Sequence, residues 1–208
     1  MKVAIVDYGA GNIESVRNAL LAAGAEPSVA RDGEAVLAAD RLVLPGVGAA
    51  GRAAGRLAES GLRDALDEAV RRRGRPMLGI CLGMELLAER LLEFGEHRGL
   101  GWLRGEVVHL RDAGVERERV PHMGWNLVEP EGEAVRFFQK PERMRTFYFC
   151  HSYTLVTPTD AAVAARVNYA RPLVAAVLHG TVLATQFHPE KSQINGQQLI
   201  RAFLDWTP

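Results

Sequence analysis

The sequence predicts an α/β fold: an open, mostly parallel sheet flanked by helices, with antiparallel strands in the C-terminal half. Three observations support this prediction. In residues 1–92, short apolar segments alternate with segments of helical periodicity, at the spacing of βα units. Glycine-rich turns follow several of these apolar segments. From residue 106 onward, short apolar segments follow one another with few helical segments between them, which favours antiparallel pairing.

The expected elements follow from apolar periodicity and from helix caps such as Asn12 and Asp32. Those of the first half are strands at 2–6, 28–30, 41–44 and 76–80, and helices at 12–24, from 32, at 62–73 and from 82 to about 92. Those of the second half are strands at 106–110, 126–128, 146–149, 162–165, 173–178 and 182–187, and a closing helix at 196–206.

Length and charge restrict the possible functions. A chain of 208 residues without a linker, repeat or low-complexity segment is expected to form one domain over residues 1–208. The formal net charge is zero, which argues against a dedicated nucleic-acid binder. One dense basic run, 71–75, closes the 62–73 helix. Because cations suit that end of the helix dipole, we interpret the run as a solvated helix end rather than a phosphate site.

Two features bear on the cellular setting. The uncharged segment 172–189 is long, but His179, Thr181 and Gln186 interrupt it, so we expect a hairpin and no membrane span. The chain has two cysteines, Cys81 and Cys150, and no secretory leader precedes the first strand. We therefore expect a reduced, cytoplasmic setting.

Cys81 lies in the most distinctive segment, 76–85, where an apolar strand enters a turn flanked by Gly79 and Gly83. In such a strand–turn–helix elbow the side chain projects from the sheet edge, the next backbone N–H is free, and the helix N-terminus is partly positive. These features favour a thiolate nucleophile. The alternative is a structural cysteine, because lone cysteines in apolar segments are usually buried.

Two further motifs supply what a cysteine nucleophile needs. The 182–187 strand leads to His188 and Glu190; residues i and i+2 of an extended chain point the same way, so the carboxylate can orient the imidazole. The segment 45–48, Pro-Gly-Val-Gly, lets a ligand approach backbone donors at the end of a parallel strand. Each motif alone is weak, since a lone histidine is usually only hydrogen-bonded and a glycine-rich turn is usually only a turn.

Together the motifs resemble those of the class I glutamine amidotransferases, whose Cys-His-Glu triad releases ammonia from glutamine. The resemblance rests on segments 79–84 (GICLGM), 188–190 (HPE) and 45–48 (PGVG). Over essentially the whole chain it extends to segments 7–12 (DYGAGN), 121–126 (PHMGWN), 151–153 (HSY) and 191–192 (KS). It implies the flavodoxin-like fold of that family.

The resemblance implies a role for each catalytic position. Cys81 would attack the carboxamide carbon of L-glutamine, His188 would take the thiol proton and protonate the departing ammonia, and Glu190 would orient His188. Backbone N–H groups of Leu82 and of Val47 and Gly48 would hold the oxyanion. No metal and no organic cofactor is expected.

The implied glutamine-binding residues are Gly46, Gly48, Glu85, Glu93 and the backbone of Ser152 and Tyr153. Glu85 departs from the pattern, because the family usually has glutamine four residues after the nucleophile. A carboxylate accepts but cannot donate hydrogen bonds, and near Cys81 it would raise the pKa of the thiol. We expect Glu85 to face the substrate, at some cost in affinity.

The resemblance also implies a partner, because ammonia released into water would be protonated and lost. The family members most similar in these segments form a heterodimer with a cyclase, a (βα)8 barrel, and are nearly silent until it binds with its ligand. The implied interface residues are Asn12, Met123, Trp125, Asn126, Tyr148 and Lys191. On composition alone, Trp125 fits the core of a buried strand equally well.

Other interpretations stay open at this point. Another amidotransferase of the class, serving pyridoxal phosphate, anthranilate or guanylate synthesis, is disfavoured by segments 7–12 and 121–126. A cysteine hydrolase or peptidase on a similar scaffold is opposed if a glutamine analogue labels Cys81. A binding module without activity is disfavoured because Cys81, His188 and Glu190 are all present.

Overall fold

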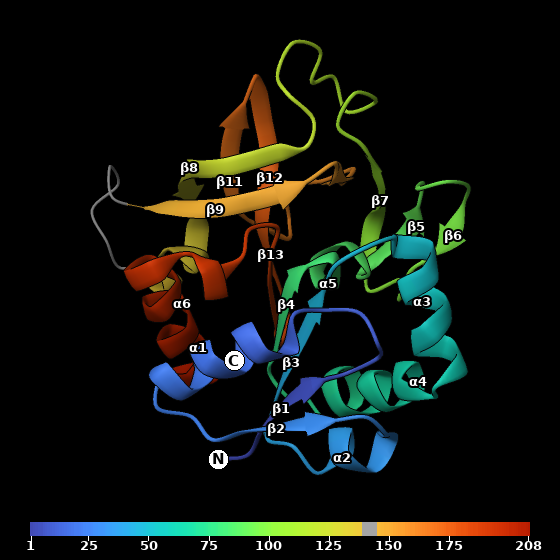
Figure 1. The fold of residues 1–208 in the computed structure, drawn as a ribbon, viewed down its shortest axis with the longest axis vertical. Coiled ribbons are helices and arrows are strands. Elements are labelled where there is room, and N and C mark those ends of the chain that lie inside the picture. The colour runs from blue at the N-terminus through green and yellow to red at the C-terminus, as the bar shows by residue number, and fades with distance from the viewer. Residues whose placement is uncertain (139–144) are drawn as a thin grey trace.

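The computed structural model describes residues 1–138 and 145–208, which form two β-sheets with helices packed around them (Figure 1). The larger sheet has nine strands in the order β2-β1-β3-β4-β13-β12-β11-β8-β9, and the smaller has four in the order β10-β7-β5-β6. The strands are β1 (Val3–Val6), β2 (Pro27–Ala30), β3 (Arg41–Gly46), β4 (Met77–Cys81), β5 (Ala88–Leu91), β6 (His97–Arg98), β7 (Leu103–His109), β8 (His122–Pro130), β9 (Thr146–His151), β10 (Tyr153–Val156), β11 (Val163–Tyr169), β12 (Arg171–His179) and β13 (Val182–Thr185). The helices are α1 (Ile13–Ala22), α2 (Gly33–Leu37), α3 (Ala50–Glu59), α4 (Leu62–Leu66, continued by a π-helical turn at Asp67–Arg72), α5 (Leu82–Glu85) and α6 (Gln193–Asp205).

Strands β2, β1, β3, β4 and β13 pair in parallel; the first four come from the first half of the chain, and β13 joins them from the second half. Their side chains alternate between two cores: Val3 and Ile5 of β1 lie in one, and Ala4 and Val6 in the other. Helices α1 and α6 cover the first core and α2, α3 and α4 the second (Figure 1). Because both faces are buried, β1, β3, β4 and β13 are almost entirely apolar, whereas the edge strand β2 is only partly buried.

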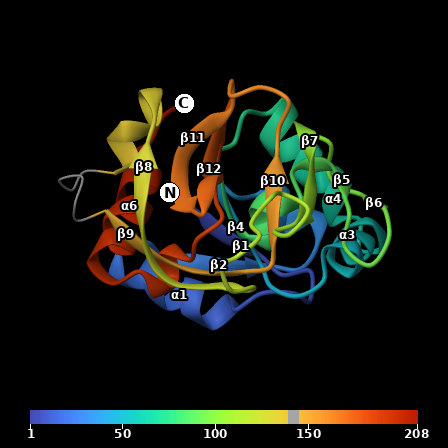
Figure 2. The ribbon, with the colours of Figure 1, turned by 90° about the horizontal axis from the view of Figure 1, so that it is seen from above.

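The other strands of the larger sheet pair antiparallel. Strands β12 and β13 form the predicted hairpin around His179–Gly180, and β11, β8 and β9 continue from β12. Strands β8 and β9 run beside each other along one side of the molecule, with His122 opposite His151 and Trp125 opposite Tyr148 (Figure 2). The predicted fold class, a mostly parallel sheet with antiparallel strands in the C-terminal half, is confirmed.

One predicted element is wrong. The helix expected from 82 to about 92 ends after Glu85, and Ala88–Leu91 is strand β5, paired in parallel with β7. Leu86, Leu87 and Leu91 are buried as their spacing indicated. A short leucine-rich run satisfies helix and strand patterns alike, and the backbone partners supplied by β7 and by residues 99–103 decide for the strand.

Other differences are smaller. Strand β3 continues through Pro45 to Gly46, and helix α3 occupies a small-residue segment where the sequence indicated no helix. No helix in the described ranges is long and apolar enough to cross a membrane. That residues 1–208 form a single domain stays a prediction.

We expect Gly83→Ala to lower the free energy of unfolding by about 2–3 kcal/mol, because a Cβ at this position would clash with the backbone oxygen of Leu44. Urea denaturation measures the change. Gly55→Ala in α3 is the matched control: its Cβ would meet no atom within 4 Å, so the substitution is expected to be neutral or to stabilise the helix by up to about 1 kcal/mol. Equal losses in the two variants would contradict this account of the turn.

Candidate active site

The predicted catalytic residues lie at one edge of the larger sheet, where the parallel strands β3, β4 and β13 end. Gly46, the last residue of β3, pairs with Cys81, the last residue of β4. Strand β13 pairs with β4 on its other side, and His188 follows it. Cys81 and His188 both line a cavity of about 730 Å³ at this edge, the position where open parallel sheets bind ligands.

Cys81 occupies a backbone conformation that residues with side chains rarely adopt, with φ 52° and ψ −108°. Neighbouring glycines make room for the turn. A Cβ at Gly79 would lie 2.8 Å from Ala184 Cβ, and one at Gly46 would meet the Tyr8 hydroxyl and the Leu82 side chain. Helix α5 begins directly after the cysteine. The predicted elbow is therefore present, with the backbone strain that is typical of functional sites.

His188 and Glu190 form a buried pair. The imidazole Nδ1 lies 2.8 Å from Glu190 Oε1, and both side chains are almost fully enclosed. The extended chain predicted for this pair is wrong, because residues Pro189–Lys191 form a 3₁₀ turn capped by His188. The tight turn, rather than strand alternation, brings the carboxylate to the ring. With Nδ1 engaged, Nε2 is the nitrogen left to act on a group in the cavity.

Ser192 fixes the backbone on which His188 sits. Its hydroxyl donates to the carbonyl of His188 at 2.6 Å and accepts the Tyr148 N–H at 3.0 Å. The His188 N–H in turn donates to the Tyr148 carbonyl at 2.9 Å. Strand β9 thereby holds the histidine loop in place.

The thiol of Cys81 is protonated at neutral pH in the resting site. The residue is 7% exposed, and burial, reinforced by the nearby Glu85, raises the pKa of the thiol well above its ordinary value. The backbone N–H of Leu82 acts in the opposite direction. The elbow does supply the free N–H that the sequence indicated, but burial outweighs it. A base must therefore take the thiol proton for the sulfur to act as a nucleophile.

Glu85 is buried beside Cys81 and lines the cavity. Its Oε1 accepts a hydrogen bond from Gln186 Nε2 at 2.9 Å, and the same Nε2 lies 3.9 Å from Cys81 Sγ. The pKa of Glu85 is raised to about 7, mainly by burial and also by the nearby Glu93, while the Gln186 hydrogen bond acts in the opposite direction. The carboxyl is thus protonated in a large share of the molecules at neutral pH, so it resembles an amide more closely than an exposed glutamate does.

The glycine loop before helix α3 lies against a second acidic residue. Gly48 has φ 101°, and Val47 beside it is exposed. Glu93 Oε2 accepts the N–H of Ala50, the first residue of α3, at 2.5 Å. The carboxylate predicted to face the substrate ammonium therefore also holds the end of the loop predicted to bind the oxyanion.

The structure brings most of the predicted site together. The predicted residues that line the cavity are Val47, Gly48, Cys81, Leu82, Glu85, Glu93, Ser152, Tyr153, His188 and Lys191. Gly46 and Glu190 lie outside the lining: Gly46 packs against Leu82, and Glu190 binds His188. The roles assigned to these residues stay predictions.

Sequence reasoning assigned no role to several residues next to the site, among them Gln186, His151 and Tyr8. Gln186 contacts Glu85, His151 lines the cavity, and the Tyr8 hydroxyl donates to the Pro45 carbonyl at 2.9 Å at the base of the glycine loop. Gln186 carried a usable signal, since it is a polar residue two positions before His188 in an apolar strand. Tyr8 and His151 lie in segments 7–12 and 151–153, which carried the resemblance, but nothing in those segments indicated their contacts, because these depend on strand pairing.

The residues predicted to face a partner have different surroundings. Met123 and Trp125 are 60% and 45% exposed, so the alternative of a core tryptophan is wrong. The Trp125 ring meets the Tyr148 ring edge-on, with the centroids 6.0 Å apart. Lys191 is exposed at the cavity, and Asn12 caps helix α1 by accepting the Ser15 N–H at 3.3 Å.

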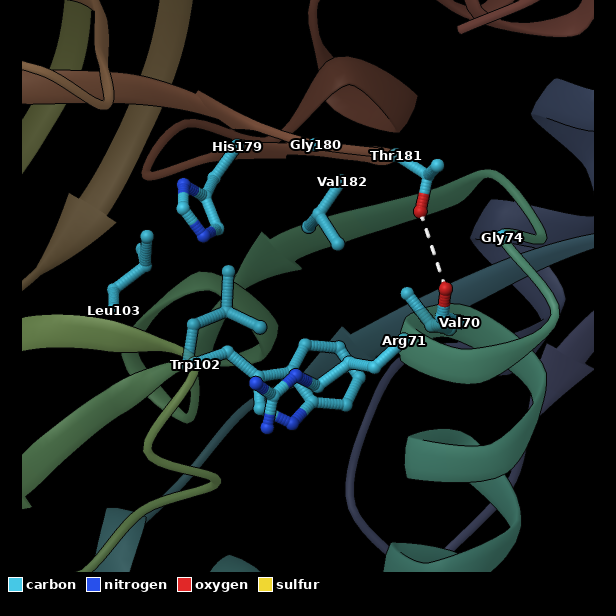
Figure 3. A pocket seen from close by; sticks show the side chains of 10 residues that line it. Val70, Arg71, Gly74, Trp102, Leu103, His179, Gly180, Thr181 and Val182 are labelled. Atoms are coloured by element: carbon cyan, nitrogen blue, oxygen red, sulfur yellow. Dashed lines mark hydrogen bonds between the residues drawn. The ribbon is translucent and has the colours of Figure 1, made fainter.

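A second cavity, of about 230 Å³, lies beside the start of β13 and the end of the π-helical turn (Figure 3). Trp102 and Val182 line it together with the side chains of Arg71 and His179. None of the described residues around it is a cysteine, serine, aspartate or glutamate, and the Thr181 hydroxyl, which also lines it, donates to the Val70 carbonyl at 3.4 Å. Among the residues placed in the structure, no cluster of three His, Cys, Asp or Glu side chains suits a metal ion.

A cysteine elbow at the edge of a mostly parallel sheet, with a histidine–glutamate pair in the turn after the neighbouring strand, is the arrangement of a nucleophilic cysteine site. The chain belongs to the family "Glutamine amidotransferase class-I", whose model matches residues 4–206. Similar curated proteins carry the name imidazole glycerol phosphate synthase subunit HisH. The one from Zymomonas mobilis is 43% identical, over 99% of this chain and 96% of its own. The one from Rhodospirillum rubrum is 43% identical over the full length of both.

Solved structures share the fold at low sequence identity. One described as a glutamine amidotransferase has a TM-score of 0.75 at 23% identity, covering 98% of this chain and 97% of its own. The structure of PurLQS from Thermotoga maritima has a TM-score of 0.69 at 18% identity, covering 98% of this chain and 97% of the matched chain. These likenesses bear on the architecture alone.

We expect Glu85→Gln to speed the alkylation of Cys81 by iodoacetamide at pH 8 by about three- to tenfold, because it lowers the pKa of the thiol and so raises the thiolate fraction. The substitution removes the carboxylate whose charge raises the pKa of the thiol. Because the pKa of Glu85 is about 7, the gain should shrink below pH 7. Peptide mapping separates Cys81 from Cys150, and the exposed Glu59→Gln is the control. A gain that is the same at pH 6 and pH 8 would contradict the charge effect.

Glu85 also makes stability depend on pH. Its pKa is higher in the folded chain than in the unfolded chain, so the folded state holds the proton more tightly and this contribution to stability is lost as pH rises from about 4.5 to 7. Relative to the parent, Glu85→Gln should therefore be more stable at pH 8 than at pH 5, by on the order of 2–3 kcal/mol. Urea unfolding at both pH values measures the difference. A constant offset between variant and parent would show that Glu85 titrates normally.

Proposed function

We propose that this chain is the glutaminase subunit of imidazole glycerol phosphate synthase: it hydrolyses L-glutamine to glutamate and passes the ammonia to a cyclase subunit. The observation that carries the proposal is the cavity in which Cys81, His188 and the glycine loop meet, in a chain similar over its full length to subunits of that name. The chemistry belongs to histidine biosynthesis. A cytoplasmic setting is part of the proposal, and the free thiols of Cys81 and Cys150 suit a reduced compartment.

The geometry suggests how the reaction begins. Glu190 engages Nδ1 of His188, so Nε2 takes the proton of the Cys81 thiol as the sulfur attacks the carboxamide carbon of glutamine. The same imidazole then protonates the leaving amine, and ammonia departs. A water activated by His188 hydrolyses the γ-glutamyl thioester to glutamate and the free thiol. The buried Glu190 stabilises the imidazolium formed at each proton transfer.

The oxyanion of each tetrahedral intermediate is assigned to backbone donors. The N–H of Leu82 follows the nucleophile directly and lies close enough to Cys81 to lower the pKa of its thiol. The second donor comes from the Val47–Gly48 peptide, which is exposed at the cavity and anchored at its far end by Glu93. Because that peptide is exposed, its orientation is free to respond to a partner, and we assign the switching of activity to it.

The cyclase partner is assigned a (βα)8 barrel that forms a heterodimer with this chain. It combines the ammonia with a phosphorylated ribulosyl aminoimidazole carboxamide ribonucleotide, giving imidazole glycerol phosphate and aminoimidazole carboxamide ribotide. Met123 and Trp125 are exposed large apolar side chains of the kind that anchor interfaces. Lys191 extends the same role to the rim of the cavity, where its ammonium pairs with an acidic residue of the partner.

The isolated chain is expected to hydrolyse glutamine slowly, and adding the cyclase with its nucleotide ligand should raise the rate of glutamate release about tenfold or more. A glutamate dehydrogenase assay follows the product. Cys81→Ala and His188→Ala should abolish activity in both conditions, whereas Trp125→Ala should weaken the response to the cyclase without reducing the rate of the isolated chain. Rapid hydrolysis that the cyclase leaves unchanged would refute the proposed switching. No hydrolysis in either condition would refute the glutaminase assignment.

A further inference from the structure

Two histidines that the proposed reaction does not use lie buried at one end of the β8–β9 pair, where His151 also lines the cavity. His122 is 1% exposed and His151 is 6% exposed. They are cross-strand partners, and His122 Nδ1 lies 2.9 Å from His151 Nε2. At one end Asn126 Nδ2 lies 2.6 Å from His122 Nε2, and at the other His151 Nδ1 lies 2.6 Å from the Tyr153 carbonyl. The Asn126 amide, the two imidazole rings and the Tyr153 carbonyl form a continuous series of three hydrogen bonds, which we call the relay.

The direction of every hydrogen bond in the relay follows from its last group, the Tyr153 carbonyl. A carbonyl oxygen only accepts, so His151 Nδ1 must carry the proton. In a neutral ring its Nε2 then accepts, so His122 Nδ1 must donate and His122 Nε2 must accept. The Asn126 side-chain amide is the donor to that nitrogen. Both rings therefore hold their proton on Nδ1, and all three bonds point from Asn126 toward Tyr153.

The surroundings of the two histidines keep their rings neutral and hold them in the orientation that the relay requires. Burial lowers the pKa of His122 to about 4 and that of His151 to about 3, so neither ring is charged at neutral pH. The His122 ring stacks between Phe149, 4.6 Å away, and Tyr169, 3.9 Å away, between centroids. Gly124 lies between Asn126 and His122 on the strand, and a Cβ there would meet no atom within 4 Å.

The two ends of the relay, Asn126 and Tyr153, lie in different parts of the molecule. Tyr153 and Ser152 line the cavity, where their backbone is assigned to the amino-acid end of glutamine. Asn126 lies on β8, whose intervening residues Met123 and Trp125 are exposed on the opposite face. The hydrogen-bond chain thus spans the distance between the surface assigned to the partner and the substrate subsite.

We propose that Asn126 and His122 are positioning residues. Together with His151 they hold the Tyr153 carbonyl and thereby fix the Ser152–Tyr153 backbone that binds the amino-acid end of glutamine. The same hydrogen bonds connect this backbone to the β8 surface. The inference rests on the proposed glutaminase function. It assigns to the relay an effect on binding rather than on bond cleavage, because its hydrogen bonds end at the Tyr153 carbonyl and involve neither Cys81 nor His188.

The first test reads the tautomers directly in the unmodified chain. Long-range ¹H–¹⁵N spectra of the imidazole rings distinguish protonation at Nδ1 from protonation at Nε2. The expected result is that His122 and His151 are neutral and protonated on Nδ1 at pH 7, an arrangement that ring packing alone would not require. A proton on Nε2 of either ring would overturn the relay, whatever the chain is found to catalyse.

The second test separates binding from reactivity at Cys81. The covalent glutamine analogue 6-diazo-5-oxo-L-norleucine has the amino-acid end, whereas iodoacetamide does not. His122→Phe keeps an aromatic ring between Phe149 and Tyr169 but breaks the relay, and Asn126→Leu removes its first donor at similar size. Both should raise the inactivation constant for the analogue about tenfold, with little change in the maximal inactivation rate or in alkylation by iodoacetamide.

Tyr169→Phe is the matched control, because it keeps the ring stacked on His122 and removes only a hydroxyl that donates to the Arg119 carbonyl. Its inactivation constant should equal that of the parent. Parent-like values in Asn126→Leu would overturn the positioning role even if His122→Phe failed to fold. Failure of the analogue to label Cys81 in the parent chain would instead refute the glutaminase function on which the inference rests.

Discussion

The site depends on how closely three parallel strand ends approach one another. Gly46 pairs with Cys81 across β3 and β4, and the positions that could separate the strands and the elbow carry no side chain. A Cβ at Gly79 or Gly83 would meet the neighbouring strand or the following turn. This lack of bulk allows Cys81 its positive φ and aims its thiol at the cavity. The glycine loop, the histidine loop and helix α5 all take their positions from that corner.

Because the turn at Cys81 is buried, charges formed there are costly, and the two nearby carboxyl groups of Glu190 and Glu85 behave differently in response. Glu190 is paired with His188, so a proton moving onto the ring is stabilised where it arrives. Glu85 has no cationic partner among the described residues near it and holds a proton up to about pH 7 instead. A thiolate beside an ionised Glu85 would place two negative charges in one enclosed volume. The raised pKa of Glu85 therefore keeps the site close to neutral when Cys81 ionises.

Local sequence pattern predicted much of the fold and singled out Cys81, His188 and Glu190, which the structure places at one edge of the sheet. The apolar strand of residues 76–80, the turn glycines and the His-Pro-Glu segment each carry their information within a few residues. The segment from 82 to 92 did not, because leucine spacing fits a helix and a strand equally and only the pairing with β7 decides. The carboxylate–imidazole pair was predicted, but its 3₁₀ turn was not.

Contacts that depend on the pairing of distant strands could not be predicted from the sequence. His122 and His151 are 29 residues apart and meet only because of the β8–β9 register. Glu93 accepts the N–H of Ala50, the first residue of α3, from a segment 43 residues away, and nothing in the sequence around Glu93 indicates that contact. The degree to which Cys81 is enclosed also depends on β13 and on Gln186 above it. Sequence therefore located the reactive groups better than it described their environment.

Strand β8 assigns two tasks to alternate positions of one short segment. Residues 123 and 125 face outward, whereas 122 and 126 take part in the buried hydrogen bonds. The two sets of residues are therefore under different evolutionary constraints. The outward residues are free to change together with the surface of another protein, while the inward residues are tied to the interior of this chain. A lineage can thus alter its pairing specificity by substituting every second residue of β8, without rebuilding the substrate site.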